Sequence, residues 1–193
     1  MQVGFSDRTW WLVLCGILAA FGSTALGQGV YFSNTRPFVT PADRRVYASD
    51  GLPLVGDNFV AQLYYGASAE SLTPLTASPL PFRNVTVTDP LAGTWLGAQR
   101  LLTGMTSDQV AILQVRAWDA TGGLSLEDAR LLGRQWGESA TFTYQIPSMG
   151  PDSAWNMEEF RSFSLVPEPS VIILALVGAL AMLVLTRRKV IPR

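Results

Sequence analysis

Residues 109–119 read QVAILQVRAWD, and this stretch decides the fold class. From position 110 to position 115 apolar side chains occupy both sets of alternating positions, as in a strand that is covered on both faces. We therefore predict a central strand here, crossing the middle of a hydrophobic core. The residues around it must supply its partners and its cover.

Neighbouring segments alternate between apolar and polar residues with the period of two that a strand requires. The clearest is ATFTYQI (140–146), and NFVAQLYYG (58–66) and NVTVT (84–88) follow the same pattern. The inward positions predicted for these segments are Ala140, Phe142, Tyr144 and Ile146, then Phe59, Ala61, Leu63 and Tyr65, then Val85 and Val87. Further short strands are expected within 30–33, 98–102 and 160–166, separated by turn residues.

One segment, SLEDARLLGRQ (125–135), departs from this period and predicts a short helix. Ser125 is placed to cap the helix, and Glu127 and Asp128 favour its first turn. Gly133 is placed to end it. The predicted apolar side of the helix consists of Leu126, Leu131 and Leu132. Several strands with one short helix predict a mainly β fold, an antiparallel β-sandwich of jelly-roll or immunoglobulin-like type, and the pattern leaves that choice open.

The first 27 residues have the layout of a secretory signal peptide. Arg8 precedes an apolar run at 10–21, and the small residues of GSTALG follow it. We expect a signal-peptide helix within 1–27, removed after Ala25 or Gly27; a first helix buried in a globular core is the alternative. Residues 28–165 then form one extracytoplasmic β-sandwich domain, long enough to bury a core of its own.

The composition of this domain excludes several classes of site. The chain has no His, and its single Cys, Cys15, lies in the predicted leader. A disulfide framework, a thiolate or imidazole metal site and a Ser-His-Asp or Cys-His nucleophile are therefore excluded from the mature domain. Residues 28–166 carry nine Arg, no Lys and 13 acidic residues, a net charge of −4. Such a surface repels phosphate backbones, so no nucleic-acid partner is expected.

Residues 171–185 form an uninterrupted apolar run, VIILALVGALAMLVL. As a helix this run is about 22 Å long at ~1.5 Å per residue, and one flanking residue on each side brings it closer to the ~30 Å of a bilayer core. Basic side chains that favour the cytoplasmic side follow at once: Arg187, Arg188 and Lys189. We predict a transmembrane helix at 170–186 and a basic membrane stop at 187–189, with residues 28–169 outside the cytoplasmic membrane.

Just before this run stands the triplet Pro167-Glu168-Pro169, within VPEPS (166–170). The order of triplet, apolar span and basic cluster resembles the PEP-CTERM sorting signal of exported bacterial proteins, which here would comprise residues 166–193. The resemblance implies an exosortase-like processing enzyme as a partner, removal of the tail, and release of the body to the cell surface or the exterior. It also implies a host that makes exopolysaccharide. On the residues alone, a stiff proline linker in a permanently anchored protein is the alternative.

The body itself carries little that indicates chemistry. VRAWD (115–119) with Gly137, Ser139 and Phe142 resembles a pattern in the bodies of some such proteins, and that pattern carries no known activity. Without His, Cys or Lys, only carboxylates such as Asp119 and Glu138 remain for catalysis, and nothing singles them out. Asp50 and Asp57 lack the spacing of a calcium loop and are predicted as turn residues, so neither a metal nor a cofactor is expected.

We therefore predict an exported, non-catalytic protein of the cell surface or extracellular matrix, and no enzyme. The alternative is a module that binds carbohydrate, in particular exopolysaccharide, because aromatic rings stack on sugar rings. The rings predicted as candidates for such stacking are Trp95, Trp136, Trp155 and Tyr64. A carboxylate-based hydrolase is a more distant alternative.

Overall fold

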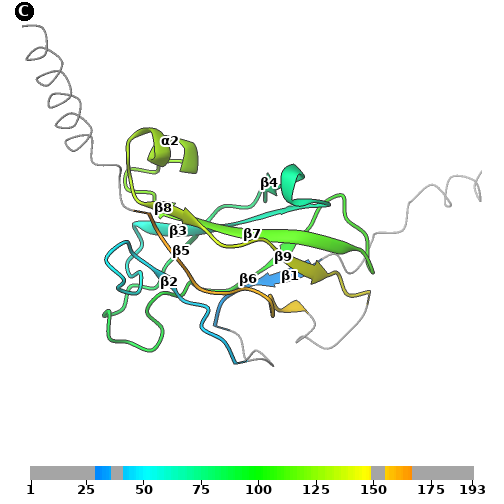
Figure 1. The fold of residues 1–193 in the computed structure, drawn as a ribbon, viewed down its shortest axis with the longest axis horizontal. Helices are drawn as coiled ribbons and strands as arrows, with labels where there is room; N and C mark the ends of the chain where they lie inside the picture. Colours follow the sequence, from blue (N-terminus) through cyan, green and yellow to red (C-terminus); the bar gives the residue numbers. More distant parts are fainter. Residues whose placement is uncertain (1–28, 36–40, 149–154, 167–193) are drawn as a thin grey trace, which may run out of the picture.

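The computed structural model of the chain describes residues 29–35, 41–148 and 155–166 (Figure 1). The predicted signal peptide, the triplet Pro167-Glu168-Pro169, the transmembrane helix (170–186) and the basic cluster (187–189) lie outside these residues. Within the described part of the chain the fold is mainly β, with one short α-helix and mostly antiparallel sheets, which confirms that part of the predicted fold class. No helix among the described residues is long and apolar enough to cross a membrane.

The elements follow one another closely along the chain. The strands are β1 (Gly29–Phe32), β2 (Val46–Tyr47), β3 (Phe59–Gly66), β4 (Thr73–Pro74), β5 (Leu80–Pro81), β6 (Ala98–Leu101), β7 (Val110–Asp119), β8 (Trp136–Glu138), β9 (Phe142–Gln145) and β10 (Phe163–Ser164). The helices are a 3-10 turn, η1 (Ala69–Ser71), and α2 (Leu126–Leu131).

The largest sheet has six strands and is built around β7, as the apolar stretch 110–115 predicts. Its path is β4-β3-β7-β8, with β5 also paired to β3 and β9 also paired to β7, and every pairing is antiparallel. The whole of β3 pairs with β7, from Phe59 opposite Asp119 to Gly66 opposite Ile112. The predicted inward face of β3 is also confirmed, because its alternate apolar residues from Phe59 to Tyr65 belong to the core.

Two small sheets cover the inner face of the six-stranded sheet. β1 pairs antiparallel with β6, and β10 pairs with β2 in parallel, which departs from a purely antiparallel prediction. In Figure 1 β1 and β6 lie below the six-stranded sheet, and α2 lies above it. The main core therefore lies on one side of the sheet, and a smaller apolar cluster lies under α2 on the other.

Trp95 is at the centre of the main core and is 0% exposed. Its ring contacts those of Phe32, Phe82 and Phe160, with centroid distances of 4.9, 5.7 and 5.9 Å. Its indole nitrogen donates a hydrogen bond to the carbonyl of Phe32 at 3.2 Å, so burial leaves no donor unpaired. Trp95 thus brings together β1, the end of β5 and the segment before β10 in one core.

The ladder shifts by one residue where β7 changes partner from β8 to β9. Residues 139–141 face only residues 114 and 115 of β7, which defines a β-bulge. The amide of Ser139 donates to the carbonyl of Val115 (2.9 Å), and the Ser139 hydroxyl accepts from the amide of Val115 (3.0 Å). A serine side chain therefore replaces a backbone acceptor where the regular ladder is interrupted.

Gly137 lets β8 approach the segment that contains β10. A Cβ atom at this position would lie 2.8 Å from the carbonyl oxygen of Ser164 and 3.0 Å from the Cα atom of Leu165. The sequence pattern that includes Gly137, Ser139 and Phe142 therefore has a structural explanation. Gly137 allows the close approach of two segments, Ser139 completes the bulge, and Phe142 packs in the core.

Two strand predictions need correction. NVTVT (84–88) is a loop, and Val87 is 42% exposed, because the chain turns at Asp89, whose amide donates to the carbonyl of Thr86 at 3.0 Å. Alternation of apolar and polar residues does not by itself form a strand when no neighbouring strand forms backbone hydrogen bonds with it. Ala140 is exposed because it lies in the bulge, whereas the rest of its segment alternates as predicted.

The helix α2 begins and ends as predicted but presents a different apolar side. Ser125 forms a capping box with Asp128, and Gly133, at φ +69°, ends the helix in a Schellman motif in which Arg134 N donates to Ala129 O at 2.7 Å. The residues that pack against the sheet are Leu126 and Ala129. The leucines at 131 and 132 were assigned to this side by the sequence and are instead exposed.

Candidate functional site

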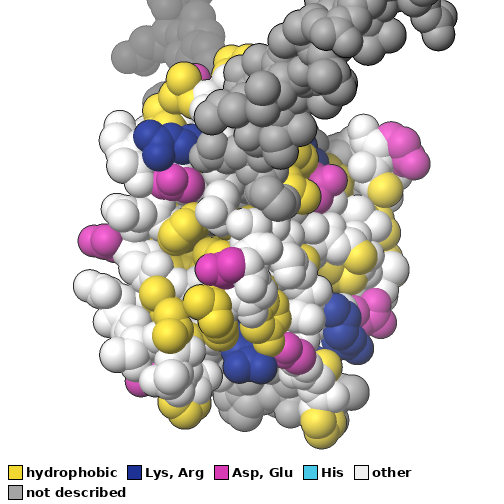
Figure 2. Space-filling model, turned by 60° about the vertical axis from the view of Figure 1, so that its left-hand side comes forward, with side chains coloured by type: hydrophobic (Ala, Val, Ile, Leu, Met, Phe, Trp, Pro, Cys, Tyr) yellow, Lys and Arg dark blue, Asp and Glu magenta, His cyan; other side chains and the backbone are white. Residues whose placement is uncertain are grey.

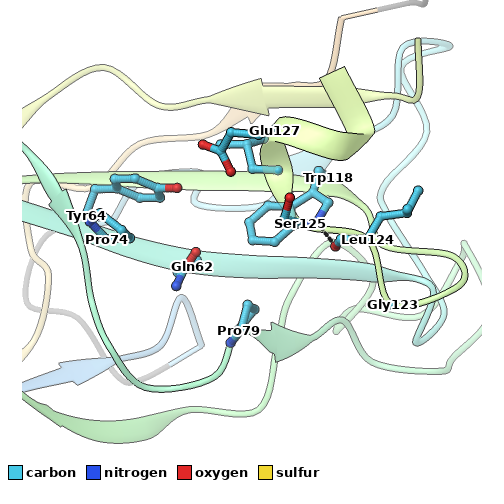
Figure 3. A pocket seen from close by; sticks show the side chains of 10 residues that line it. Gln62, Tyr64, Pro74, Pro79, Trp118, Gly123, Leu124, Ser125 and Glu127 are labelled. Atoms are coloured by element: carbon cyan, nitrogen blue, oxygen red, sulfur yellow. Dashed lines mark hydrogen bonds between the residues drawn. The ribbon is translucent and has the colours of Figure 1, made fainter. Parts of the chain in front are cut away.

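A hollow of about 400 Å³ lies on the outer face of the six-stranded sheet (Figure 3). Alternate residues of β3 and β7 form its floor, since residues i and i+2 of a strand share a face. Gln62 and Tyr64 come from β3, and Trp118 comes from β7. Pairing of Val60 with Trp118 and of Gln62 with Arg116 places these side chains on neighbouring strands of one sheet.

Two loops and α2 form the walls of the hollow. Figure 3 shows Glu127 of α2 on one side of the hollow and Pro79 on the other, with Gln62 between them. The wall before α2 is fixed because the indole nitrogen of Trp118 donates to the carbonyl of Leu124 at 3.0 Å. The opposite wall is fixed because the side-chain nitrogen Nε2 of Gln62 donates a hydrogen bond to the backbone carbonyl of Leu75 at 3.0 Å.

The rings of the hollow are largely covered by the protein's own side chains. Tyr64 is 5% exposed and Trp118 is 2% exposed. The guanidinium carbon of Arg116 lies 4.0 Å from the centroid of the Tyr64 ring, a cation–π contact that occupies one ring face. Burial raises the pKa of Tyr64, and the positive charge of Arg116 partly opposes that increase. The hollow therefore offers ring edges and the exposed carboxylate of Glu127 rather than open ring faces.

The four rings predicted for sugar stacking do not form one surface. Trp95 is wholly buried in the core, where its ring packs against Phe32, Phe82 and Phe160, so its assignment as a stacking ring is wrong. Trp155 lies on the other side of the sheet, against Gly29 of β1. Tyr64 and Trp136 do share the outer face, in the smaller apolar cluster.

Trp136 is also covered on one face. The guanidinium carbon of Arg130 lies 3.6 Å from the centroid of its ring. Arg130 is in the last turn of α2, so this contact ties the helix to β8. Only part of the Trp136 ring is left accessible, and its backbone carbonyl accepts a hydrogen bond from Val166 N at 2.8 Å.

The carboxylates considered for hydrolysis are not brought together. Asp119 pairs with Arg134 at 3.5 Å, and Glu138 pairs with Arg116 at 3.4 Å. Asp50 accepts a hydrogen bond from the backbone amide of Leu52 at 3.0 Å, as a turn residue does. Among the described residues there is no group of three or more acidic, His or Cys side chains placed to hold a metal ion.

Sequence reasoning identified one residue of the hollow and missed the rest. Tyr64 was named, whereas Trp118, Gln62 and Glu127 were not among the predicted site residues. The signal for Gln62 was present, because it lies two residues from Tyr64 in a strand of period two. Glu127 carried no such signal, because the docking of α2 beside this face follows from packing distant in sequence.

Comparison of the chain with models of protein families, with curated proteins and with solved structures finds no match.

Proposed function

We propose that the chain is an exported, non-catalytic protein of the cell surface or extracellular matrix, directed there by a PEP-CTERM sorting signal at 166–193. The leader at 1–27 starts its export, and the helix at 170–186 holds it in the cytoplasmic membrane with the β-domain outside. An exosortase-like enzyme then acts at Pro167-Glu168-Pro169 and releases the domain. The body at 28–165 is a β-sandwich whose role is structural.

The observation that carries this proposal is the order of segments between residues 166 and 189. A proline-bounded triplet, an apolar run and three basic residues follow one another without interruption. Each part has a physical use: the prolines keep the triplet extended, the run fits lipid, and the basic residues stop transfer. A soluble core helix of this length would normally show a polar face toward water, and residues 171–185 have none.

The described strands are compatible with this arrangement, because the last of them, β10, ends at Ser164, before the triplet. Leu165 N donates to the carbonyl of Tyr47 at 2.8 Å, and Val166 N donates to the carbonyl of Trp136 at 2.8 Å. The triplet begins at the next residue, Pro167. Cleavage at the triplet would therefore leave every described strand of the domain intact.

A carbohydrate-binding module remains the second candidate. It is favoured by the outer-face hollow, where Tyr64, Gln62 and Glu127 come together. It is disfavoured by the covered ring faces, since stacking on a sugar needs an open ring. We therefore place a structural role before sugar binding, and hydrolysis last, because Asp119 and Glu138 each pair with a separate arginine.

The proposal is tested by the mass of the C-terminus after expression in a host that has the processing enzyme. We expect loss of the tail from the wild-type protein, and retention of the tail when the signal is altered by Pro169→Ala. Pro90→Ala is the matched control, because Pro90 is an exposed turn residue outside the signal. Its product should be processed like the wild type.

Two results would contradict the proposal. If all of the wild-type product still ends at Arg193, there is no sorting by cleavage. If Pro169→Ala and Pro90→Ala are processed equally, the enzyme does not recognise the triplet, which is then only a linker.

A further inference from the structure

Two neighbouring leucines at the end of α2 are exposed to an unusual degree. Leu131 is 85% exposed, the highest value among the large apolar side chains of the described residues, and Leu132 is 63% exposed. We call them the α2 leucine pair. Single exposed leucines are ordinary on soluble domains, but two adjacent ones at a helix end form a protruding apolar point.

The exposure of this pair is fixed by well-formed local structure. Leu126 and Ala129 face the sheet at a spacing of three residues, so the residue at 131 must face away. The capping box of Ser125 and the Schellman motif at Gly133 define both ends of the helix. The pair therefore cannot turn inward unless α2 unfolds or leaves the sheet.

The pair lies at the place where the chain leaves the domain. Val166, the last described residue, is bonded through its amide to the backbone carbonyl of Trp136, and Arg130 of α2 lies on the ring of that same residue. Figure 1 shows the segment after β10 ending beside β8, beneath α2. Figure 2 shows apolar side chains next to basic ones at the upper left of the molecule.

The chain between the domain and the apolar run is short. From Val166 to Val171 it can span at most about 18 Å, at ~3.3–3.6 Å per residue. A domain of this size has a radius of gyration of about 14 Å. Because this tether is well under twice the radius of gyration, and so shorter than the width of the domain, the face around Val166 turns toward whatever holds residue 171.

We infer that α2 is a membrane-docking element: the α2 leucine pair inserts into the bilayer that holds residues 171–185. This inference rests on the membrane anchor of the proposed function. Apolar side chains of interfacial elements enter about 5–10 Å below the headgroup level, which suits two protruding leucines beside a Trp136–Arg130 contact. Docking would hold the domain in one orientation, with Pro167-Glu168-Pro169 at the membrane surface.

The test uses the full chain in phosphatidylcholine vesicles, with one environment-sensitive fluorophore attached through a single cysteine. Cys15, the only native cysteine, is replaced by Cys15→Ala. The probe is placed by Leu132→Cys or, as the matched control, by Leu101→Cys. Leu101 is 58% exposed and lies on β6, on the other side of the six-stranded sheet from α2. Because both side chains are exposed, neither substitution disturbs the core.

We expect the probe at 132 to emit at shorter wavelength in vesicles than in detergent-free buffer, and to be quenched by lipids that carry a nitroxide near the headgroup. The probe at 101 should show neither effect. Equal signals from both positions, or quenching at 101 alone, would overturn the docking. A blue-shifted probe at 132 without lipid quenching would also overturn it, because a protein surface or a second copy would then cover the pair. Failure of the chain to float with the vesicles would instead overturn the membrane anchor itself.

Discussion

The hydroxyl of Ser139 gives the sharpest test of how the main sheet is held together. Ser139→Ala keeps the backbone bond from Ser139 N to Val115 O but removes the acceptor of the Val115 amide. Val115 is 0% exposed, so water cannot replace the lost partner. An unpaired buried amide costs about 1–3 kcal/mol, and we expect the free energy of unfolding to fall by about 2 kcal/mol.

In a domain of this size about 2 kcal/mol corresponds to a fall in Tm of about 4–8 °C. The assay is thermal unfolding of the full chain in a mild detergent, followed by circular dichroism. Thr141→Ala is the matched control, because Thr141 lies in the same bulge with its side chain exposed. Its effect should stay within about 0.5 kcal/mol. If Ser139→Ala melts at the same temperature as Thr141→Ala, the hydroxyl does not complete the ladder and the account of the bulge is wrong.

Two further substitutions test packing and pH dependence. Gly137→Ala should lower the free energy of unfolding by about 1–3 kcal/mol, because its Cβ would lie 2.8 Å from the Ser164 carbonyl oxygen; an unchanged Tm in the same melts would show that β8 and β10 do not pack closely. Burial raises the pKa of Tyr144 above its ordinary value of 10.0, and its hydroxyl donates to the carbonyl of Gly29 at 2.8 Å. The folded state thus favours the neutral phenol, so this stabilisation is complete below pH 10 and is lost as the pH rises further, with a slope of up to about 1.4 kcal/mol per pH unit. Tyr144→Phe should be less stable at neutral pH and should flatten the alkaline part of a Tm-against-pH curve, whereas a parallel curve would contradict this origin.

Much of the architecture could be predicted because it depends on short stretches of sequence. The apolar run at 110–115 predicted the central strand β7, and alternation predicted which residues of β3 face the core. The helix α2 was predicted from its caps, since Ser125 and Gly133 act on groups within one turn of themselves. The same local reasoning produced a strand at NVTVT, with which none of the described strands pairs.

The candidate site was much less predictable. Tyr64 and Trp136 were named from their residue type, and the structure places both on the outer face, but it also places Trp95 in the core and Trp155 elsewhere. An aromatic side chain fits a core and a binding face equally well. Which of the two it joins depends on neighbours that are far away in sequence, such as Phe160 for Trp95.

The sequence by itself determined the segment order, the β class, the absence of His and thiol chemistry from the domain, and the two apolar stretches that predict contact with lipid. These follow from residue type and from spacing along the chain. The tertiary structure alone decided the parallel pairing of β2 with β10, the bulge at Ser139, the coverage of Tyr64 and the outward α2 leucine pair. The reason is physical: a strand or a helix face is buried only by what packs against it, and that partner is chosen by the whole fold.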